Sequence, residues 1–133
     1  ETVNNSATLQ NDDALFLAMA ANETWFFFLY FATVGNSTAD FKFAFTIPSG
    51  ATMRWSRDLF KIHTDSTTQF SASVTTSGGT DSFDGNASEI GSYLAGVVVN
   101  GSTAGNLQFQ WAQNTATAVD TKVLTNSYLE AHK

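Results

Sequence analysis

The apolar run at residues 25–31 (WFFFLYF) constrains the fold of this chain more than any other segment. Successive side chains of a β-strand point to opposite faces, and in this run both faces are apolar. A strand with one face in water should instead alternate apolar with polar residues. One face can fill the core of the domain, and the other face then needs a second cover. The two faces are Trp25, Phe27, Leu29 and Phe31 on one side, and Phe26, Phe28, Tyr30 and Ala32 on the other.

The second cover is either a second sheet layer or another subunit. The run therefore predicts an oligomeric all-β protein whose function lies in assembly more than in chemistry. The residues that we expect at a subunit or core interface are Trp25, Phe26, Phe28 and Tyr30.

Composition agrees with an all-β domain and offers little for catalysis. The chain has 133 residues, enough for one domain, and only 14% of them are charged. Ser, Thr, Asn, Gly and Ala are abundant, which is typical of strand proteins with many turns. The chain has no Cys, so disulfides and thiolate metal sites are excluded. We expect no cofactor.

The charge balance limits the possible partners. Six Lys and Arg stand against 12 Asp and Glu, for a formal net charge of -6. Nucleic acid is an unsuitable partner, because phosphate binding needs clustered Lys and Arg. No apolar stretch approaches the roughly 18 residues of a membrane span, so no membrane partner is expected. The net charge favours solubility at high local concentration.

Alternation of apolar and polar residues predicts the strands. Phe41, Phe43 and Phe45 point one way at residues 39–47, and Pro48 ends that strand. About eight to ten short strands and no helix are expected, as in a sandwich or a barrel. The expected strands are 14–19, 23–33, 39–47, 51–56, 90–100, 107–112, 121–124 and 127–132, with weaker signals at 60–63 and 69–76. The expected core is Phe41, Phe43, Phe45, Leu107, Phe109 and Trp111.

Residues 1–13 are polar and are expected to form an N-terminal arm before a single domain at 14–133, and a first short strand within residues 1–11 is the alternative. Turn-forming residues at 11–13 (NDD) separate the arm from the domain. The arm has low apolar content and no evident core role, so we expect it to be mobile until it adds as a strand to a partner. A local basic cluster offers a second docking surface, or simply solvated strand edges. The docking candidates are Glu1, Asn4 and Asn5 of the arm, and Arg54, Arg57 and Lys61 of the cluster.

Two sets of residues have the residue types of a catalytic or metal site, but neither has the required spacing. His63, Asp65 and Ser66 are the residue types of a hydrolase triad, but no spacing ties a nucleophile to His63. The loop expected at 77–88 contains Asp81 and Asp84 beside a glycine, which could contribute to a calcium site. Its spacing does not match an EF-hand, and turns use the same residue types. The chain is therefore predicted not to be an enzyme.

Several blocks resemble a recurrent module of tailed-bacteriophage virion proteins. They are residues 8–13 (TLQNDD), 39–52 (ADFKFAFTIPSGAT) and 105–114 (GNLQFQWAQN), followed by a closing strand at 127–132 (SYLEAH). The likeness runs in the same order over nearly the whole chain, and its motifs are structural. Members of that family resemble small trimeric jelly rolls that decorate capsids or form modules of tail and fibre proteins. The closing strand is often basic in that family, whereas this chain has Glu130 there.

The resemblance implies an antiparallel β-sandwich of jelly-roll type. It implies a capsid decoration (cement) protein, bound as a homotrimer to the major capsid protein on the outer surface of a phage head. The alternative is a tail-fibre or receptor-binding module that contacts a host glycan through exposed loops. Either assignment places the protein in the virion.

Overall fold

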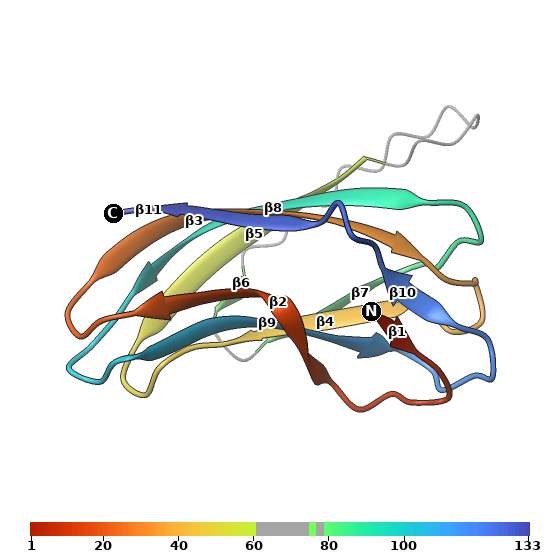
Figure 1. Ribbon diagram of the computed structural model, residues 1–133, viewed down its shortest axis with the longest axis horizontal. Helices are drawn as coiled ribbons and strands as arrows, with labels where there is room; N and C mark the ends of the chain where they lie inside the picture. The colour runs from red at the N-terminus through yellow and green to blue at the C-terminus, as the bar shows by residue number, and fades with distance from the viewer. Residues whose placement is uncertain (61–74, 77–78) are drawn as a thin grey trace.

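The computed structural model describes residues 1–60, 75–76 and 79–133 and shows two antiparallel sheets packed face to face (Figure 1). The long strands of sheet A form the upper layer of the figure, and sheet B forms the lower layer. The described residues contain no helix, and the predicted β-sandwich is confirmed. The strands are β1 (Thr2–Val3), β2 (Gln10–Met19), β3 (Thr24–Val34), β4 (Phe41–Thr46), β5 (Thr52–Phe60), β6 (Thr75–Thr76), β7 (Thr80–Phe83), β8 (Ile90–Val99), β9 (Gly105–Gln113), β10 (Thr121–Val123) and β11 (Tyr128–His132).

Strands that follow one another in the sequence mostly lie in different sheets. Sheet A has the order β1-β10-β3-β8-β5-β6, and β11 also pairs with β3. Sheet B has the order β2-β9-β4-β7. The long β3 is thus the centre of sheet A, with β8 along one side and β10 and β11 along the other. The described part of the chain has eleven strands, one more than the upper limit expected, and β1 and β7 lie outside the expected strand ranges.

The core lies between the sheets and is largely aromatic. Phe31 of β3 stacks on Phe41 of β4, with ring centroids 5.6 Å apart, and Phe41 stacks on Trp111 of β9 at the same separation. Burying such rings is the largest favourable contribution to folding in a domain of this size. The predicted core is confirmed, since each of its members is at most 2% exposed: Phe41, Phe43, Phe45, Leu107, Phe109 and Trp111.

The turn expected at residues 11–13 is instead a bulge inside β2. The pairing of β2 with β9 shifts register between Asn11 and Phe16. Asp12 is 5% exposed, and its Oδ1 accepts the backbone N–H groups of Ala14 at 3.0 Å and Leu15 at 2.9 Å. A short acidic side chain that bonds nearby backbone can form a turn or interrupt a strand pairing. The turn chemistry was therefore correctly recognised, but the strand continues past it.

The first residues are more closely tied to the domain than the sequence indicated. Thr2 and Val3 form β1, which pairs with β10. Val3 is 4% exposed and belongs to the core, so the expectation that this segment has no core role is wrong. One apolar side chain in a polar stretch is enough to anchor a short strand when a partner strand lies beside it. The separate behaviour of residues 1–13 as an arm stays a prediction.

The loop expected at residues 77–88 contains the edge strand β7. Its residues pair with β4, and Phe83 stacks on Phe41 with ring centroids 5.1 Å apart. The glycine-rich composition concealed this strand, because only Phe83 provides an inward apolar side chain. The weak strand signal at 69–76 overlaps β6 at its last two residues. The rest of that signal, and residues 61–63 of the other weak strand, lie outside the described residues.

Candidate functional site

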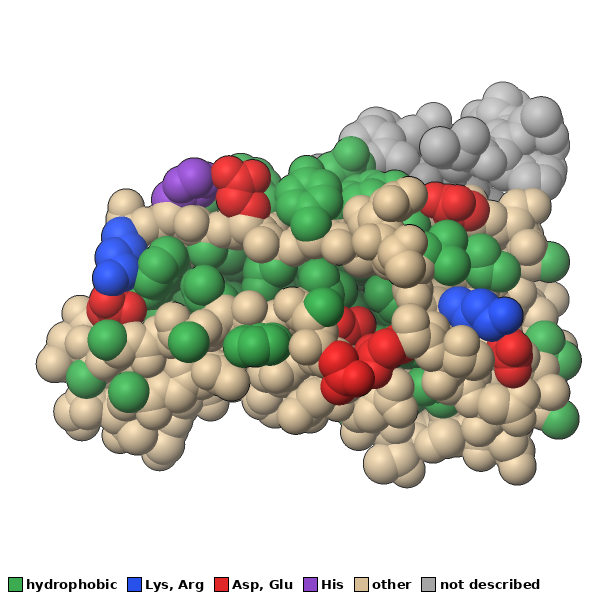
Figure 2. Space-filling view, viewed as in Figure 1, with side chains coloured by type: hydrophobic (Ala, Val, Ile, Leu, Met, Phe, Trp, Pro, Cys, Tyr) green, Lys and Arg blue, Asp and Glu red, His purple; other side chains and the backbone are tan. Residues whose placement is uncertain are grey.

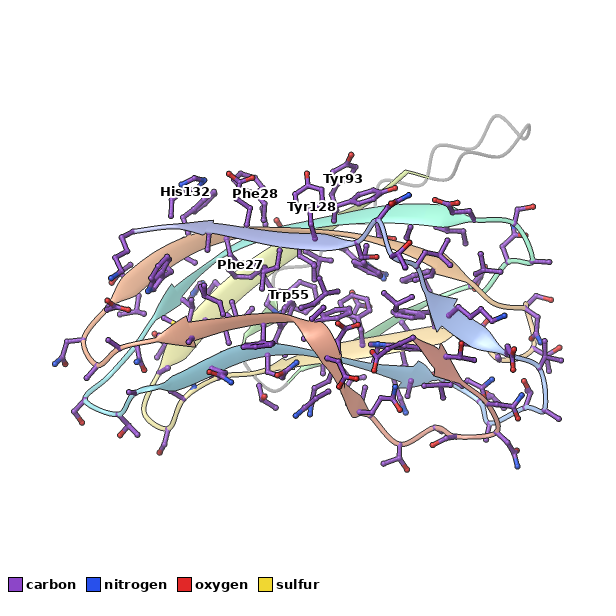
Figure 3. All side chains as sticks on the ribbon, viewed as in Figure 1. Phe27, Phe28, Trp55, Tyr93, Tyr128 and His132 are labelled. Carbon is purple, nitrogen blue, oxygen red and sulfur yellow. The ribbon has the colours of Figure 1, made fainter. Side chains whose placement is uncertain are left out.

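The outer face of sheet A carries an exposed patch of aromatic and aliphatic side chains, which we call the aromatic face. Figure 3 shows Phe28, Tyr93 and Tyr128 projecting from the upper layer away from the sandwich, whereas Phe27 and Trp55 point between the sheets. In Figure 2 hydrophobic side chains protrude from the upper edge of the molecule. The aromatic face comprises Phe26, Phe28 and Tyr30 of β3, Tyr93, Val97 and Val99 of β8, and Tyr128 of β11.

Strand register brings these residues together from distant parts of the chain. Phe26 pairs with Val97 of β8, and Tyr30 pairs with both Tyr93 of β8 and Tyr128 of β11. Directly opposed residues of neighbouring strands point to the same face and contact one another. Phe26 and Phe28 lie edge to face with ring centroids 5.0 Å apart. The patch is therefore one continuous surface over three strands.

The three tyrosines form the denser end of the aromatic face. The ring of Tyr30 lies 4.9 Å from that of Tyr93 and 5.9 Å from that of Tyr128, measured between centroids. Gly91 makes room for Tyr30, because a Cβ at Gly91 would lie 2.9 Å from the Tyr30 hydroxyl. Burial, the charge of Glu89 and the two neighbouring tyrosines raise the pKa of Tyr30 above its usual value of 10.0. Each phenol adds a hydrogen-bonding hydroxyl group to the apolar surface of its ring.

The exposure of this patch is large for residues of these types. Phe26 and Phe28 are each 44% exposed, Tyr93 is 45% exposed and Tyr128 is 51% exposed. Single apolar residues on a protein surface are common, but a contiguous apolar patch usually marks an interaction site. The arrangement can bind another apolar surface.

Charged residues flank the aromatic face on both sides. Arg54 of β5 is exposed and faces outward, because it alternates with the buried Met53 and Trp55. On the opposite flank, Glu130 and His132 of β11 lie 2.7 Å apart between Oε1 and Nε2. Figure 3 shows His132 projecting on the same side of the sheet as Phe28.

Trp25, expected at an interface, is on the inward side of β3 and lies outside the aromatic face. It is half-buried against the core, and its Nε1 donates to Glu23 Oε2 at 2.9 Å. The ammonium of Lys133 lies 4.9 Å from the centroid of its ring and also contacts Glu23. These donors lower the pKa of Glu23 to about 2, the bond from Lys133 being the largest cause. Trp25 thus closes the end of the core.

The basic cluster is divided between the two faces of β5. Arg57 is 7% exposed, and its Nε lies 2.9 Å from Asp81 Oδ2, so it does not present its charge to a partner. Its guanidinium lies over the rings of Phe43 and Phe83, and burial lowers its pKa. Strand periodicity explains the split, because residues 54 and 57 are an odd number apart. Lys61 lies outside the described residues.

The docking candidates of the arm bond to their own domain. The amide of Asn4 donates to Ala118 O at 3.1 Å and to Asp120 Oδ1 at 3.0 Å, and the N–H of Asn5 donates to Thr117 O. A carboxylate oxygen of Glu1 accepts from Trp111 Nε1 at 3.3 Å. Burial, followed by the nearby charge of Asp12, raises the pKa of Glu1.

The chemical candidates gain no support from the described residues. His63, Asp65 and Ser66 lie outside the residues that the structure describes. Asp81 is in β7 and forms an ion pair with Arg57, so this carboxylate of the expected loop already has a partner. Within residues 1–60, 75–76 and 79–133, no group of three or more His, Asp and Glu side chains could hold a metal ion.

The sequence predicted the β3 part of the aromatic face and missed the parts that β8 and β11 contribute. Phe26, Phe28 and Tyr30 were expected, whereas Tyr93 and Tyr128 were not assigned to any site. A signal for the β8 part was present, because residues 93–99 (YLAGVVV) are apolar in both phases, as residues 25–31 are. No local signal pointed to Tyr128, since only the pairing of β11 with β3 brings it beside Tyr30.

Comparison with protein-family models, with curated proteins and with solved structures finds no match to this chain. In the described part of the chain, no helix has the length and apolarity needed to cross a membrane.

Proposed function

We propose that this chain is a non-enzymatic structural protein that decorates the outer surface of a tailed-phage head as a homotrimer. The single observation that carries the proposal is the aromatic face, where four aromatic rings are between 44% and 51% exposed. Interfaces between subunits that remain together resemble a protein core cut in half. Burying the aromatic face between copies would remove this apolar surface from water.

The strand orders support the jelly-roll type for this sandwich. Strands β2 to β9 divide into the orders β2-β9-β4-β7 and β3-β8-β5-β6 within the two sheets. A jelly roll is an eight-stranded double sheet in which early and late strands pair in this interleaved way. β1, β10 and β11 then extend sheet A beyond this framework.

The position on the virion comes from the sequence resemblance. The blocks at 8–13, 39–52 and 105–114 resemble virion modules that decorate capsids, and they make the major capsid protein the proposed partner. Measuring the number of copies in purified particles tests this position. A cement protein is present in hundreds of copies, whereas a fibre component is present in few.

Light scattering on the isolated domain tests the use of the aromatic face. We expect the mass of an oligomer at micromolar concentration, and the mass of one chain for Phe28→Ser. Phe16→Ser is the matched control, because Phe16 is 46% exposed on β2 of the other sheet and lies outside the aromatic face. A wild-type protein that stays a soluble monomer at this concentration would refute assembly through this surface.

The N-terminal segment remains a proposed contact with the shell, and the structure adds a condition. An arm that pairs with a capsid strand must first leave β10, which would expose Val3. The test is to delete residues 1–10 and to measure how much of the variant binds to purified shells. Because backbone pairing depends weakly on salt, we expect the deletion to lower this occupancy at both low and high salt. Val3→Ala, which keeps the backbone, is the control. Undiminished occupancy after the deletion would rule out the arm, and loss of full-length binding only at high salt would point to Arg54 and Lys61.

The second candidate is a fibre or receptor-binding module that contacts a host glycan. The tyrosine cluster favours it, because Tyr30, Tyr93 and Tyr128 offer apolar rings with hydroxyl groups in one place. Binding of the isolated domain to host surface glycans, abolished by Tyr128→Ala without a change in mass, would support this candidate over the first.

No turnover is expected of the protein in either role. An esterase or glycanase activity that disappears in His63→Ala would overturn the structural assignment. We expect no such activity, because the sequence ties no second acid or base to His63.

A further inference from the structure

We propose that the copies meet head to tail around a rotation axis, with Arg54 of one copy against Glu130 of the next. This inference rests on the proposed function, because it specifies how the copies that bury the aromatic face are arranged. The occupant of each flank is therefore the opposite flank of another copy of this chain.

Arg54 and Glu130 place opposite charges on the two flanks of the aromatic face. Strand register forms a row across sheet A from Arg54 through Val97 and Phe26 to His132. The adjacent row ends at Glu130, which pairs with Phe28. Neighbouring strands lie about 4.8 Å apart, so the two flanks are separated by roughly 14 Å of apolar surface. The cation on β5 and the carboxylate on β11 are thus fixed on either side of the patch.

Each charge retains capacity for a further partner. Among the residues that the structure describes, Arg54 forms no ion pair. Glu130 contacts His132 through Oε1, and its side chain is 54% exposed. A guanidinium donates in a fork that matches the two oxygens of a carboxylate. An approaching Arg54 can therefore bond to Glu130 without displacing His132.

The geometry of a ring brings the two flanks together. When several copies turn the same sheet face towards a common axis, the β5 flank of each copy faces the β11 flank of its neighbour. Such a contact is heterologous, and closure of the ring limits its size. Opposite charges at the meeting flanks favour this register and disfavour contacts between like flanks. The aromatic rings then face the axis and one another.

Two other arrangements make different predictions. A two-fold axis across the strands would place Arg54 near Arg54 of the second copy, which like-charge repulsion disfavours. A two-fold axis along the strands would also oppose Arg54 and Glu130, but it gives the mass of two chains. A measured mass of three chains is expected, and a mass of two would overturn the ring.

A charge exchange between the flanks tests the contact itself. Sedimentation velocity over a range of concentrations gives the midpoint of assembly for wild type, Arg54→Glu, Glu130→Arg and the double variant. We expect each single variant to raise the midpoint at least about tenfold, because like charges then meet at each flank. The double variant should return to within about threefold of wild type, since the opposite charges are restored.

Lys122→Glu is the control for net charge. It changes the charge of the chain by the same amount as Arg54→Glu, at a half-exposed residue of β10 that forms an ion pair with Asp120. We expect its midpoint to equal that of wild type. Circular dichroism and thermal unfolding establish that each variant is folded before its assembly is compared.

The outcomes separate this inference from the proposed function. If Phe28→Ser dissociates the oligomer while the charge variants leave the midpoint unchanged, burial of the aromatic face stands and the Arg54–Glu130 contact is refuted. Double-variant assembly as weak as that of the single variants would also refute the contact. A monomeric wild type would overturn the proposed assembly, and the contact with it.

Discussion

The outer faces of the two sheets differ in how their side chains are satisfied. On sheet B, Gln108 is 8% exposed and donates to Asp12 O at 2.8 Å, and Lys42 Nζ donates to Ala7 O at 2.6 Å. On sheet A, Phe26 and Phe28 are exposed and contact each other edge to face.

This difference shows which sheet has outer side chains that are satisfied within one chain. Polar groups on sheet B find hydrogen-bond partners in the same chain, so nothing further is required to cover them. Apolar groups on sheet A can lower their free energy only by leaving water, and the part of the chain that the structure describes places no further layer over them. Phe16 on β2 is exposed too, but a single exposed ring needs no partner.

The largest expected effect concerns the core that both faces share. Phe43 is 0% exposed and packs on Phe31 and Phe109, so Phe43→Ala should lower the free energy of unfolding by about 3–5 kcal/mol. Gln110→Ala on the outer side of β9 should cost little, because its amide bonds only to the exposed Asn11. Denaturant unfolding of both variants measures the difference. Equal losses would show that the assignment of inner and outer faces is wrong.

The next effect compares the two outer faces directly. Gln108→Ala removes two buried hydrogen bonds, to Asp12 O and Phe109 O, and should lower the free energy of unfolding by about 1–3 kcal/mol. Phe28→Ser should change the stability of the single chain by less than this while reducing assembly. Both are measured by urea unfolding at concentrations below the assembly midpoint. A larger loss in Phe28→Ser would mean that the aromatic face stabilises the monomer.

A smaller effect is expected at the ends of sheet B. Lys42→Met keeps the aliphatic part of the side chain and removes the bond to Ala7 O, which should lower the free energy of unfolding by about 0.5–1.5 kcal/mol. Hydrogen exchange of the N-terminal residues measures the local consequence. Unchanged exchange there would show that this bond does not hold the segment against sheet B.

The smallest effect concerns pH and the edge of sheet A. The pKa of Glu23 is lowered from 4.5 to about 2, so its contribution to stability is present above about pH 4.5 and is lost as the pH falls towards 2. Lys133→Ala should remove most of this dependence, because the bond from Lys133 is its largest cause. Fluorescence of the chain between pH 5 and 2, compared with Trp25→Phe, measures the change. A pH profile unaffected by Lys133→Ala would contradict this assignment.

The sequence predicted most strands because alternation and turn residues report local preference. Residues 39–47 and 107–112 alternate cleanly, and β4 and β9 are found there with the expected inward faces. The errors occur where the same residue types are compatible with two local structures, a turn or loop on the one hand and a strand on the other. The Asp-rich segment before Ala14 forms a bulge in place of a turn, and β7 has too few apolar residues to be recognised.

The candidate site was predictable only in part, because strand pairing assembles it. Residues 25–31 are apolar on both faces of the strand, and this pattern identified Phe26, Phe28 and Tyr30. The pairing of β3 with β8 and β11 added Tyr93 and Tyr128, which are 65 and 100 residues from Phe28 in the chain. The burial of Arg57 also required the tertiary structure, because its partner Asp81 comes from the other sheet.

The sequence by itself determined that this chain forms strands, that its core is aromatic and that one strand has two apolar faces. Those properties depend on residue type and spacing along the chain, which local sterics and the hydrophobic effect convert into structure. Only the tertiary structure decided which of the two faces is buried and which residues surround the exposed one. That choice depends on register between distant strands, and register is set by the packing of all the strands at once.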